Sequence, residues 1–339
     1  ENLDIKQMML ELFSEQVAGF YNSRSKELFL IAETPRANKS LWTRLLGPKE
    51  FDPEEQKATL SHELAHAIAD QHFDLSRFDT LLEGNEDAAL ALSALIEGEA
   101  MLVMLAEMTR QRDEEGQEVL KLQPEAVDRL FSVMSLANMG GGKAMRNTPP
   151  FFRRSLVFPY HQGTVFLAHL ANHGGRSTVD QALRFPPLST EQVLHPKKYL
   201  DAQQADPPIR VALASWESLL PNWKVLGEDT LGEYQIRLML HDQSDHREAA
   251  AGWGGDRYIV LRRPANPLRE PQDDSTTRSS DSILLWHTTW DTADDAREFA
   301  RSLTRESQST LRLPDGPEIQ MKVTGEAERT VQLSGGRRP

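Results

Sequence analysis

The chain has 339 residues, enough for about two domains of ordinary size. Its formal net charge is −13, which argues against non-specific binding to nucleic acid or anionic lipid, since both require clustered Lys and Arg. It holds no cysteine, which excludes disulfides, cysteine-ligated metal centres and a cysteine nucleophile. No apolar run reaches the length of about 18 residues that a membrane-spanning helix needs. Glu97 and Glu99 interrupt the most apolar stretch, Ala88 to Met108.

The first half of the chain is predicted to be mainly helical, with one small β-hairpin near its N-terminus. Asp52-Pro53-Glu54-Glu55 is typical of a helix start, because a capping residue is followed by proline and by acids in the first turn. The hairpin is expected to pair two short strands across a polar turn at 22–26. The expected strands are 17–21 and 28–32, and the expected helices are about 4–16, 52–72, 86–112, 124–138 and 151–173.

Glycine and proline divide the middle of the chain. The three glycines at 140–142 predict a flexible loop that continues to Pro150. Pro159 predicts a kink or a break in the helix that follows, and Gly174-Gly175 predicts its end. The short helices expected beyond it, ahead of an extended proline-rich stretch, are about 177–184 and 189–194.

The character of the sequence changes after about Asp206, which predicts two domains, residues 1–205 and 206–339. The second is expected to be a smaller α+β domain, in which helices are followed by antiparallel strands with one further helix. The segment 264–281, rich in Pro, Ser, Asp and Arg, is expected to be a mobile loop. The expected elements are helices within about 229–250, strands at 258–262, 283–289, 318–323 and 329–333, and a helix at 292–307.

The motif that carries chemistry is His62-Glu63-Leu64-Ala65-His66, an HExxH sequence within the predicted helix 52–72. Residues four apart lie one above the other on a helix, so both imidazoles can reach one metal ion. Glu63 is placed to take a proton from water at that metal, and zinc lowers the pKa of such water to about 7. We therefore expect Zn²⁺ as cofactor, His62 and His66 as metal ligands, and Glu63 as the catalytic base and acid.

A catalytic zinc site needs a third protein ligand, with the fourth position left to water. His72 would complete HExxHxxAxxH, one residue from the metzincin pattern. On a continuous helix it points about 240° away from His66, and a left-handed turn at Ala69 costs about 1–2 kcal/mol. Glu97 lies in the middle of the next helix, among apolar residues, where a carboxylate is costly unless paired or bound to metal. Glu97 is therefore the favoured third ligand, and His72 and Glu99 are the alternatives.

The sequence from His62 to Asp70, HELAHAIAD, resembles the active-site helix of thermolysin-like gluzincins. Ile96-Glu97-Gly98-Glu99-Ala100 is similar to the glutamate-bearing second helix of that clan. The wider pattern resembles uncharacterised bacterial HExxH proteins. The resemblance covers these two helices, and it implies an α+β chain with a mainly helical, zincin-like metallopeptidase domain over 1–205 and a small N-terminal sheet.

The resemblance also implies two kinds of supporting residue. In the clan, an Asp four residues after the ligating Glu often holds a zinc-binding His. Met101 occupies that position here, so Asp70 or Glu99 is expected to serve instead. Zincins often place a Tyr or His where it stabilises the oxyanion of the tetrahedral intermediate, and Tyr160 and His161 are the candidates.

We therefore expect a zinc metallopeptidase that acts on a peptide or protein substrate, with the hairpin 17–32 offering an edge strand to an extended peptide. The alternatives are a catalytically inactive zincin-fold binding protein and a zinc amidohydrolase that acts on a cell-envelope amide. No nucleic-acid partner and no membrane span are expected, and the oligomeric state is left open. The resemblance favours a secreted or cell-envelope protein.

Overall fold

The computed structural model describes residues 5–16, 19–30, 53–78, 82–110, 122–137, 143–213, 217, 220–240, 246–263, 282–310, 318–324 and 330–336. Within them, the prediction of a mainly helical α+β chain is confirmed. The chain forms two compact units. Unit 1 consists of Glu1–Leu82, Ala89–Pro187 and Gln192–Ala202, and unit 2 of Glu83–Ala88, Leu188–Glu191 and Gln203–Pro339. The domain boundary expected at 205 and 206 lies close to the last of these divisions, at Ala202 and Gln203.

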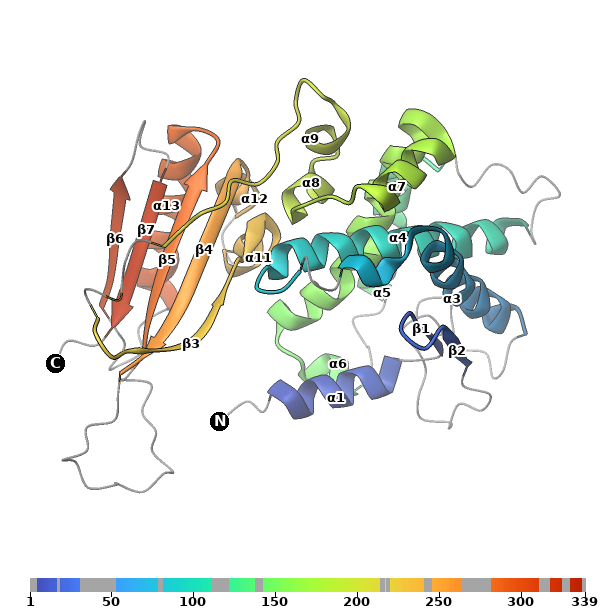
Figure 1. The fold of residues 1–339 in the computed structure, drawn as a ribbon, viewed down its shortest axis with the longest axis horizontal. Helices are drawn as coiled ribbons and strands as arrows, with labels where there is room; N and C mark the ends of the chain where they lie inside the picture. The colour runs from blue at the N-terminus through green and yellow to red at the C-terminus, as the bar shows by residue number, and fades with distance from the viewer. Residues whose placement is uncertain are drawn as a thin grey trace. The chain divides into compact units, whose positions relative to one another are not determined.

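Helices dominate the described part of the chain up to residue 202 (Figure 1). The helix with the HExxH motif, α3, begins at Pro53 and runs without a break to Phe73, as its capping pattern predicts. The other helices are α1 (Ile5–Gln16), the 3₁₀ helix η1 (Leu75–Phe78), α4 (Glu86–Arg110), α5 (Pro124–Ala137), α6 (Lys143–Asn147), α7 (Pro150–Arg184), α8 (Thr190–Leu194) and α9 (Lys197–Leu200).

A two-stranded antiparallel hairpin lies against α3. Its strands are β1 (Gly19–Asn22) and β2 (Glu27–Leu30), within two residues of their predicted bounds. Asn22 shapes the turn, because its side-chain oxygen accepts hydrogen bonds from the backbone N–H groups of Arg24 and Ser25, at 3.0 and 3.2 Å. Its carbonyl also accepts the N–H of Lys26 at 2.8 Å, which closes the turn.

Two expectations for the middle of the chain, a loop over 143–147 and a break at Pro159, are wrong. A short helix, α6, occupies 143–147, where a loop was expected, and residues 139–142 lie outside the described residues. Helix α7 continues through Pro159 with helical backbone, because proline removes only one hydrogen bond from a helix this long and well packed. The non-helical residues inside it are Gly174 and Gly175, and the helix resumes beyond them. Gly175 has φ 66° and ψ −155°, a conformation that glycine adopts without strain.

Helix α4 supplies much of the core of unit 1. Ala91, Ala94, Leu95 and Ala100 are completely buried on it. By length and composition alone, its residues 86–108 could cross a membrane, but the core helix of a water-soluble protein passes the same test. More than half of its apolar window is buried inside the protein. The prediction of no membrane span is therefore not contradicted among the described residues.

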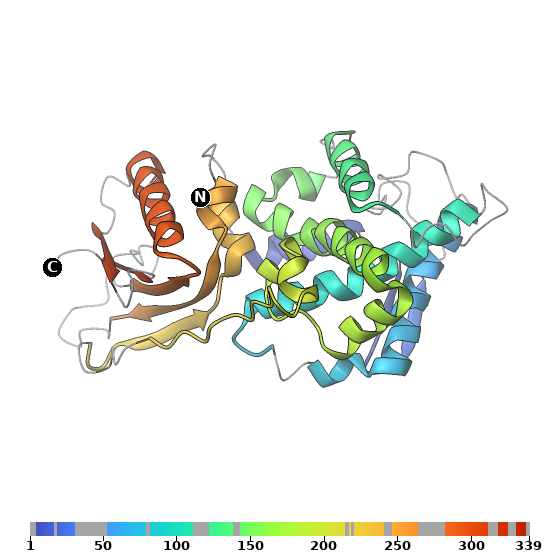
Figure 2. The ribbon, with the colours of Figure 1, turned by 90° about the horizontal axis from the view of Figure 1, so that it is seen from above.

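Unit 2 is organised around a five-stranded antiparallel sheet of order β3-β4-β5-β7-β6, with helices on one face (Figure 2). Its core joins Trp253, Trp286 and Trp290 of the sheet to Phe299 of the covering helix. The ring of Phe299 stacks on Trp290 with 4.6 Å between centroids. The elements are β3 (Lys224–Asp229), α11 (Gly232–Met239), α12 (His246–Ala250), β4 (Trp253–Arg262), β5 (Ser282–Trp290), α13 (Ala293–Thr310), β6 (Glu318–Thr324) and β7 (Thr330–Gly336).

The first two strands of the sheet in unit 2, β3 and β4, differ from the prediction. The sequence predicts no strand at β3, and it starts β4 at 258 although the strand begins at Trp253. The buried Asp256 explains the longer strand. Its carboxylate accepts hydrogen bonds from the indole N–H groups of Trp253 and Trp286, at 3.0 and 2.9 Å, which holds a glycine-rich stretch in the sheet. The loop expected at 264–281 lies outside the described residues.

Candidate metal centre

The two histidines of the HExxH motif lie side by side on α3. Their Nε2 atoms are 3.2 Å apart, and the rings meet edge to face with 4.7 Å between centroids. His62 is buried and His66 is nearly so. The spacing of four residues on an unbroken helix produces this arrangement directly.

Glu97 of α4 reaches the same point from the second helix. Its Oε2 lies 3.1 Å from Nε2 of His62 and 3.5 Å from Nε2 of His66. Four ligands in tetrahedral order about a zinc ion, at about 2.0–2.1 Å, lie about 3.3 Å from one another. The three measured separations, 3.1, 3.2 and 3.5 Å, fit that geometry and the nitrogen and oxygen donors that zinc accepts.

A close crossing of α4 and α7 positions the glutamate. A Cβ atom on Gly98 would lie 2.4 Å from the carbonyl of Gly163, and one on Gly163 would lie 2.1 Å from the carbonyl of Ala94. Neither position accepts a larger residue without moving a helix. Gly98 follows Glu97 directly, so this contact fixes where the carboxylate enters the site.

The same crossing brings Tyr160 to the site. Its ring stacks on His62 with 6.3 Å between centroids, and its hydroxyl donates a hydrogen bond to the carboxylate of Glu97. Burial, followed by the negative charges of Glu97 and Glu63, raises the pKa of Tyr160 well above its ordinary value. The phenol therefore keeps its proton at any ordinary pH and acts as a hydrogen-bond donor.

Glu63 is buried next to the three candidate ligands. Burial raises its pKa above the ordinary value, against the opposing effect of His62 and His66. The backbone N–H of Tyr21, in β1, donates a hydrogen bond to the Glu63 carboxylate. Because this N–H does not bond to β2, that edge of β1 faces the site.

Charge is distributed unevenly among the three candidate ligands. Burial raises the pKa of Glu97, but hydrogen bonds from His62 and His66 outweigh it and lower the pKa to about 2. Burial lowers the pKa of His66, but Glu97 outweighs it and leaves the pKa above its ordinary value. A carboxylate that is ionised at all ordinary pH values therefore faces two imidazoles, an arrangement that favours a cation.

Two other histidine candidates lie elsewhere. His161 follows Tyr160 on α7 but pairs with Asp128 of α5, at 2.8 Å, and stacks on Phe131. His72 is exposed near the end of α3, beside Phe73, because the helix does not break at Ala69. Among the described residues, neither His161 nor His72 belongs to the group formed by His62, His66 and Glu97.

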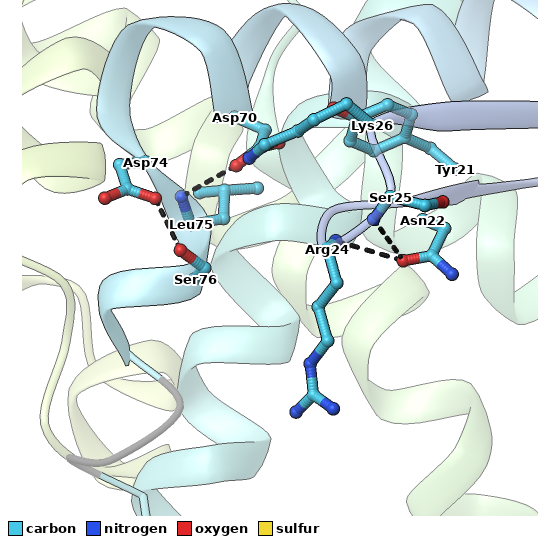
Figure 3. A network of polar contacts seen from close by, with 9 residues as sticks. All are labelled: Tyr21, Asn22, Arg24, Ser25, Lys26, Asp70, Asp74, Leu75 and Ser76. Carbon is cyan, nitrogen blue, oxygen red and sulfur yellow. Dashed lines mark hydrogen bonds and ion pairs between the residues drawn. The ribbon is translucent and has the colours of Figure 1, made fainter.

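The residues expected to support a ligating histidine are also engaged elsewhere. Asp70 accepts hydrogen bonds from the hydroxyl of Tyr21, at 2.8 Å, and from the ammonium group of Lys26, at 2.6 Å (Figure 3). Burial raises the pKa of Asp70, but these two bonds outweigh it and leave the pKa below the ordinary value. Glu99 pairs with Arg176 at 3.1 Å. Nδ1 of His66 is buried and has no hydrogen-bond partner among the described residues.

The sequence did not predict that Tyr21 contacts Glu63 at the candidate site. Its place on a predicted hairpin strand was visible, but neither spacing nor composition shows that its N–H meets Glu63.

A group of three acidic residues in unit 2 was also not predicted from the sequence: Glu191, Asp206 and Asp291. One carboxylate oxygen from each lies within 4.8 Å of the others, and such groups are common in proteins that bind no ion there.

Comparison with known proteins gives one match. The model of a domain of unknown function, DUF8575, matches residues 222–335, which is about a third of the chain and lies within unit 2. No curated protein and no solved structure matches significantly.

Proposed function

We propose that this protein is a zinc-dependent peptidase of the gluzincin type, with a zincin-like catalytic unit that contains α3 and α4. One observation carries the proposal. Two imidazole nitrogens and a carboxylate oxygen from two helices converge with tetrahedral spacing, and Glu63 is buried beside them. A chance HExxH sequence on a surface helix would not meet a third donor from another helix.

The chain's own residues have distinct roles in this proposal. His62, His66 and Glu97 hold the zinc ion, which when bound supplies Lewis acidity that polarises a carbonyl and acidifies an attacking water. Glu63 accepts a proton from that water at its carboxylate and passes it to the leaving nitrogen. Tyr160 keeps its phenolic proton, and in this proposal its hydroxyl turns from Glu97 to donate a hydrogen bond to the oxyanion that forms on the carbonyl.

The hairpin is the proposed support for the substrate. The edge of β1 that carries the Tyr21 N–H faces the candidate ligands. An extended peptide can add to such an edge through main-chain hydrogen bonds, at groups other than the Tyr21 N–H, which Glu63 accepts. A peptide bound there would run past the ligands with one of its carbonyl groups near Tyr160.

The test is hydrolysis of a mixed peptide library by the zinc-loaded protein and its Glu63→Gln variant. The wild type is expected to cleave peptides, and the variant to lose about 10²–10⁴-fold in rate, since Gln cannot take a proton. Zinc content is expected to stay at one ion per chain in both. Glu107→Gln, on the same unit but outside the site, is the matched control and should keep wild-type activity.

Three outcomes contradict the proposal. Cleavage that persists in Glu63→Gln removes Glu63 from the reaction. Zinc binding without cleavage of any peptide indicates an inactive binding protein. Cleavage of cell-wall amides and not of peptides indicates an amidohydrolase.

A further inference from the structure

The buried carboxylate of Asp70 joins the hairpin to the end of α3 (Figure 3). In addition to the bonds from Tyr21 and Lys26, it accepts the backbone N–H of Leu75, just beyond the helix, at 3.1 Å. One side chain therefore fixes three segments: a strand, the turn of the hairpin, and the chain that leaves α3.

Two residues around this contact have a strained backbone. Lys26 has φ 58° and Asp74 has φ 50°, and a left-handed conformation costs a residue other than glycine about 1–2 kcal/mol. Such strain persists where surrounding contacts determine the conformation. Lys26 is held by Asn22 and by Asp70, and the N–H of Asp74 bonds to the Asp70 carbonyl at 2.8 Å. One strained residue, Lys26, therefore lies in the hairpin turn, and the other, Asp74, lies just after α3, and both segments contact Asp70.

Tyr21 connects this contact to the candidate catalytic base. Its hydroxyl bonds to Asp70, and its backbone N–H bonds to the carboxylate of Glu63. Glu63 and Asp70 are seven residues apart, so they lie within about 20° of one another around α3 and about 10 Å apart along it. Tyr21 spans that distance, with its ring at one end and its backbone at the other.

We propose that Tyr21 and Asp70 are positioning residues for Glu63. Asp70 anchors the hairpin, and the anchored hairpin holds the Tyr21 N–H on the Glu63 carboxylate and so fixes its direction. The inference rests on the proposed function, in which Glu63 transfers the proton. A misplacement of about 1 Å at such a group costs about 10²-fold in rate.

The experiment removes the anchor and leaves the N–H in place. Tyr21→Phe deletes the hydroxyl that bonds to Asp70, and Lys26→Met deletes the ion pair. Tyr199→Phe is the matched control, because that hydroxyl bonds to the carbonyl of Phe185 at 2.6 Å, outside the site. We expect kcat to fall about 10- to 100-fold in Tyr21→Phe, while KM changes less than about threefold and Tyr199→Phe stays at the wild-type value.

Amide hydrogen exchange of the metal-free protein supplies a readout that needs no activity. Exchange at the N–H of residue 21 is expected to accelerate in Lys26→Met, and in Glu63→Ala, which removes the acceptor. Unchanged exchange in both variants would overturn the inference, even if the wild type proved not to be a peptidase. In an active enzyme, a wild-type kcat in Tyr21→Phe, or a loss of activity that follows the melting temperature alone, would also overturn it.

Discussion

At the scale of single residues, the candidate centre is a place where a cation and a proton compete for the same imidazole. The ionised Glu97 raises the pKa of His66, so this imidazole holds a proton more readily than an ordinary histidine does. A metal ion needs neutral imidazoles, so it competes with protons for this site. We therefore expect zinc binding to weaken as the pH falls.

Exchange of one carboxylate for an amide tests the ligand set. Glu97→Gln removes the negative charge from the site, and we expect its zinc affinity to fall at least about 100-fold. Glu99→Gln is the matched control on the same helix, since Glu99 pairs with Arg176 and not with the histidines, and it should bind zinc like the wild type. The measurement is competition with a chromophoric chelator. Equal affinities would remove Glu97 from the ligand set.

Some residues of the candidate site can be predicted from the sequence, and others cannot, because their position depends on how helices pack. His62 and His66 follow from helix spacing alone, and Glu97 follows from the cost of a carboxylate on an apolar helix. The choice between Tyr160 and His161 does not follow from sequence, because adjacent helical residues differ by about 100° and only packing decides which faces α4. Tyr160 lies on that side, whereas His161 faces Asp128 of α5. The roles of all these residues stay predictions.

At the scale of elements, the site depends on how closely α4 approaches α7. Gly98 and Gly163 let the two backbones meet without intervening side chains. Glu97 and Tyr160 stand next to this contact, so their mutual geometry depends on it. A helix spacing set by larger side chains would move the carboxylate relative to Tyr160.

Gly98→Ala tests this dependence. Alanine favours helices by about 1 kcal/mol over glycine, but its Cβ would lie 2.4 Å from the Gly163 carbonyl. We expect a net loss of about 1–3 kcal/mol in stability and weaker zinc binding. Gly227→Ala, where nothing lies within 4 Å, is the control and should leave both unchanged. Thermal denaturation with and without zinc measures the effect, and a stabilised Gly98→Ala variant would contradict the account.

Local patterns predicted most elements, and the errors arise where the rest of the molecule decides. Capping residues and periodicity placed α3, α4 and α5. Strand β3 was missed because it is largely exposed and lacks an alternating pattern, so its pairing with β4 makes it a strand. The helix does not break at Pro159, because packing along α7 outweighs one lost hydrogen bond. Local sequence patterns do not predict the pairing of β3 with β4 or the packing along α7.

At the scale of the whole molecule, the two units respond to different conditions. The candidate metal ligands all belong to unit 1, so bound zinc should stabilise that unit. Unit 2 contains a buried acid, Asp87, whose protonation depends on pH. Burial raises the pKa of Asp87 to about 8, although Thr190 donates hydrogen bonds to it from its backbone N–H, at 3.1 Å, and from its hydroxyl.

The raised pKa of Asp87 gives unit 2 a predictable pH dependence. Between the ordinary value of 3.8 and about 8, the folded protein keeps a proton that the unfolded chain has released. Stability therefore falls as the pH rises through this window, by at most about 1.4 kcal/mol per pH unit. Asp87→Asn keeps the oxygen that Thr190 binds and cannot ionise. We expect the melting temperature of unit 2 to fall less between pH 5 and pH 8 in this variant, as calorimetry can measure. Equal slopes in the two proteins would show that Asp87 is ionised in the fold.

Anomalous diffraction at the zinc edge tests most directly whether His62, His66 and Glu97 hold one zinc ion. Crystals grown with zinc are expected to show a peak about 2.0–2.2 Å from Nε2 of both histidines and from a carboxylate oxygen of Glu97. No peak at this place, or one that lacks Glu97 as a ligand, would contradict the account.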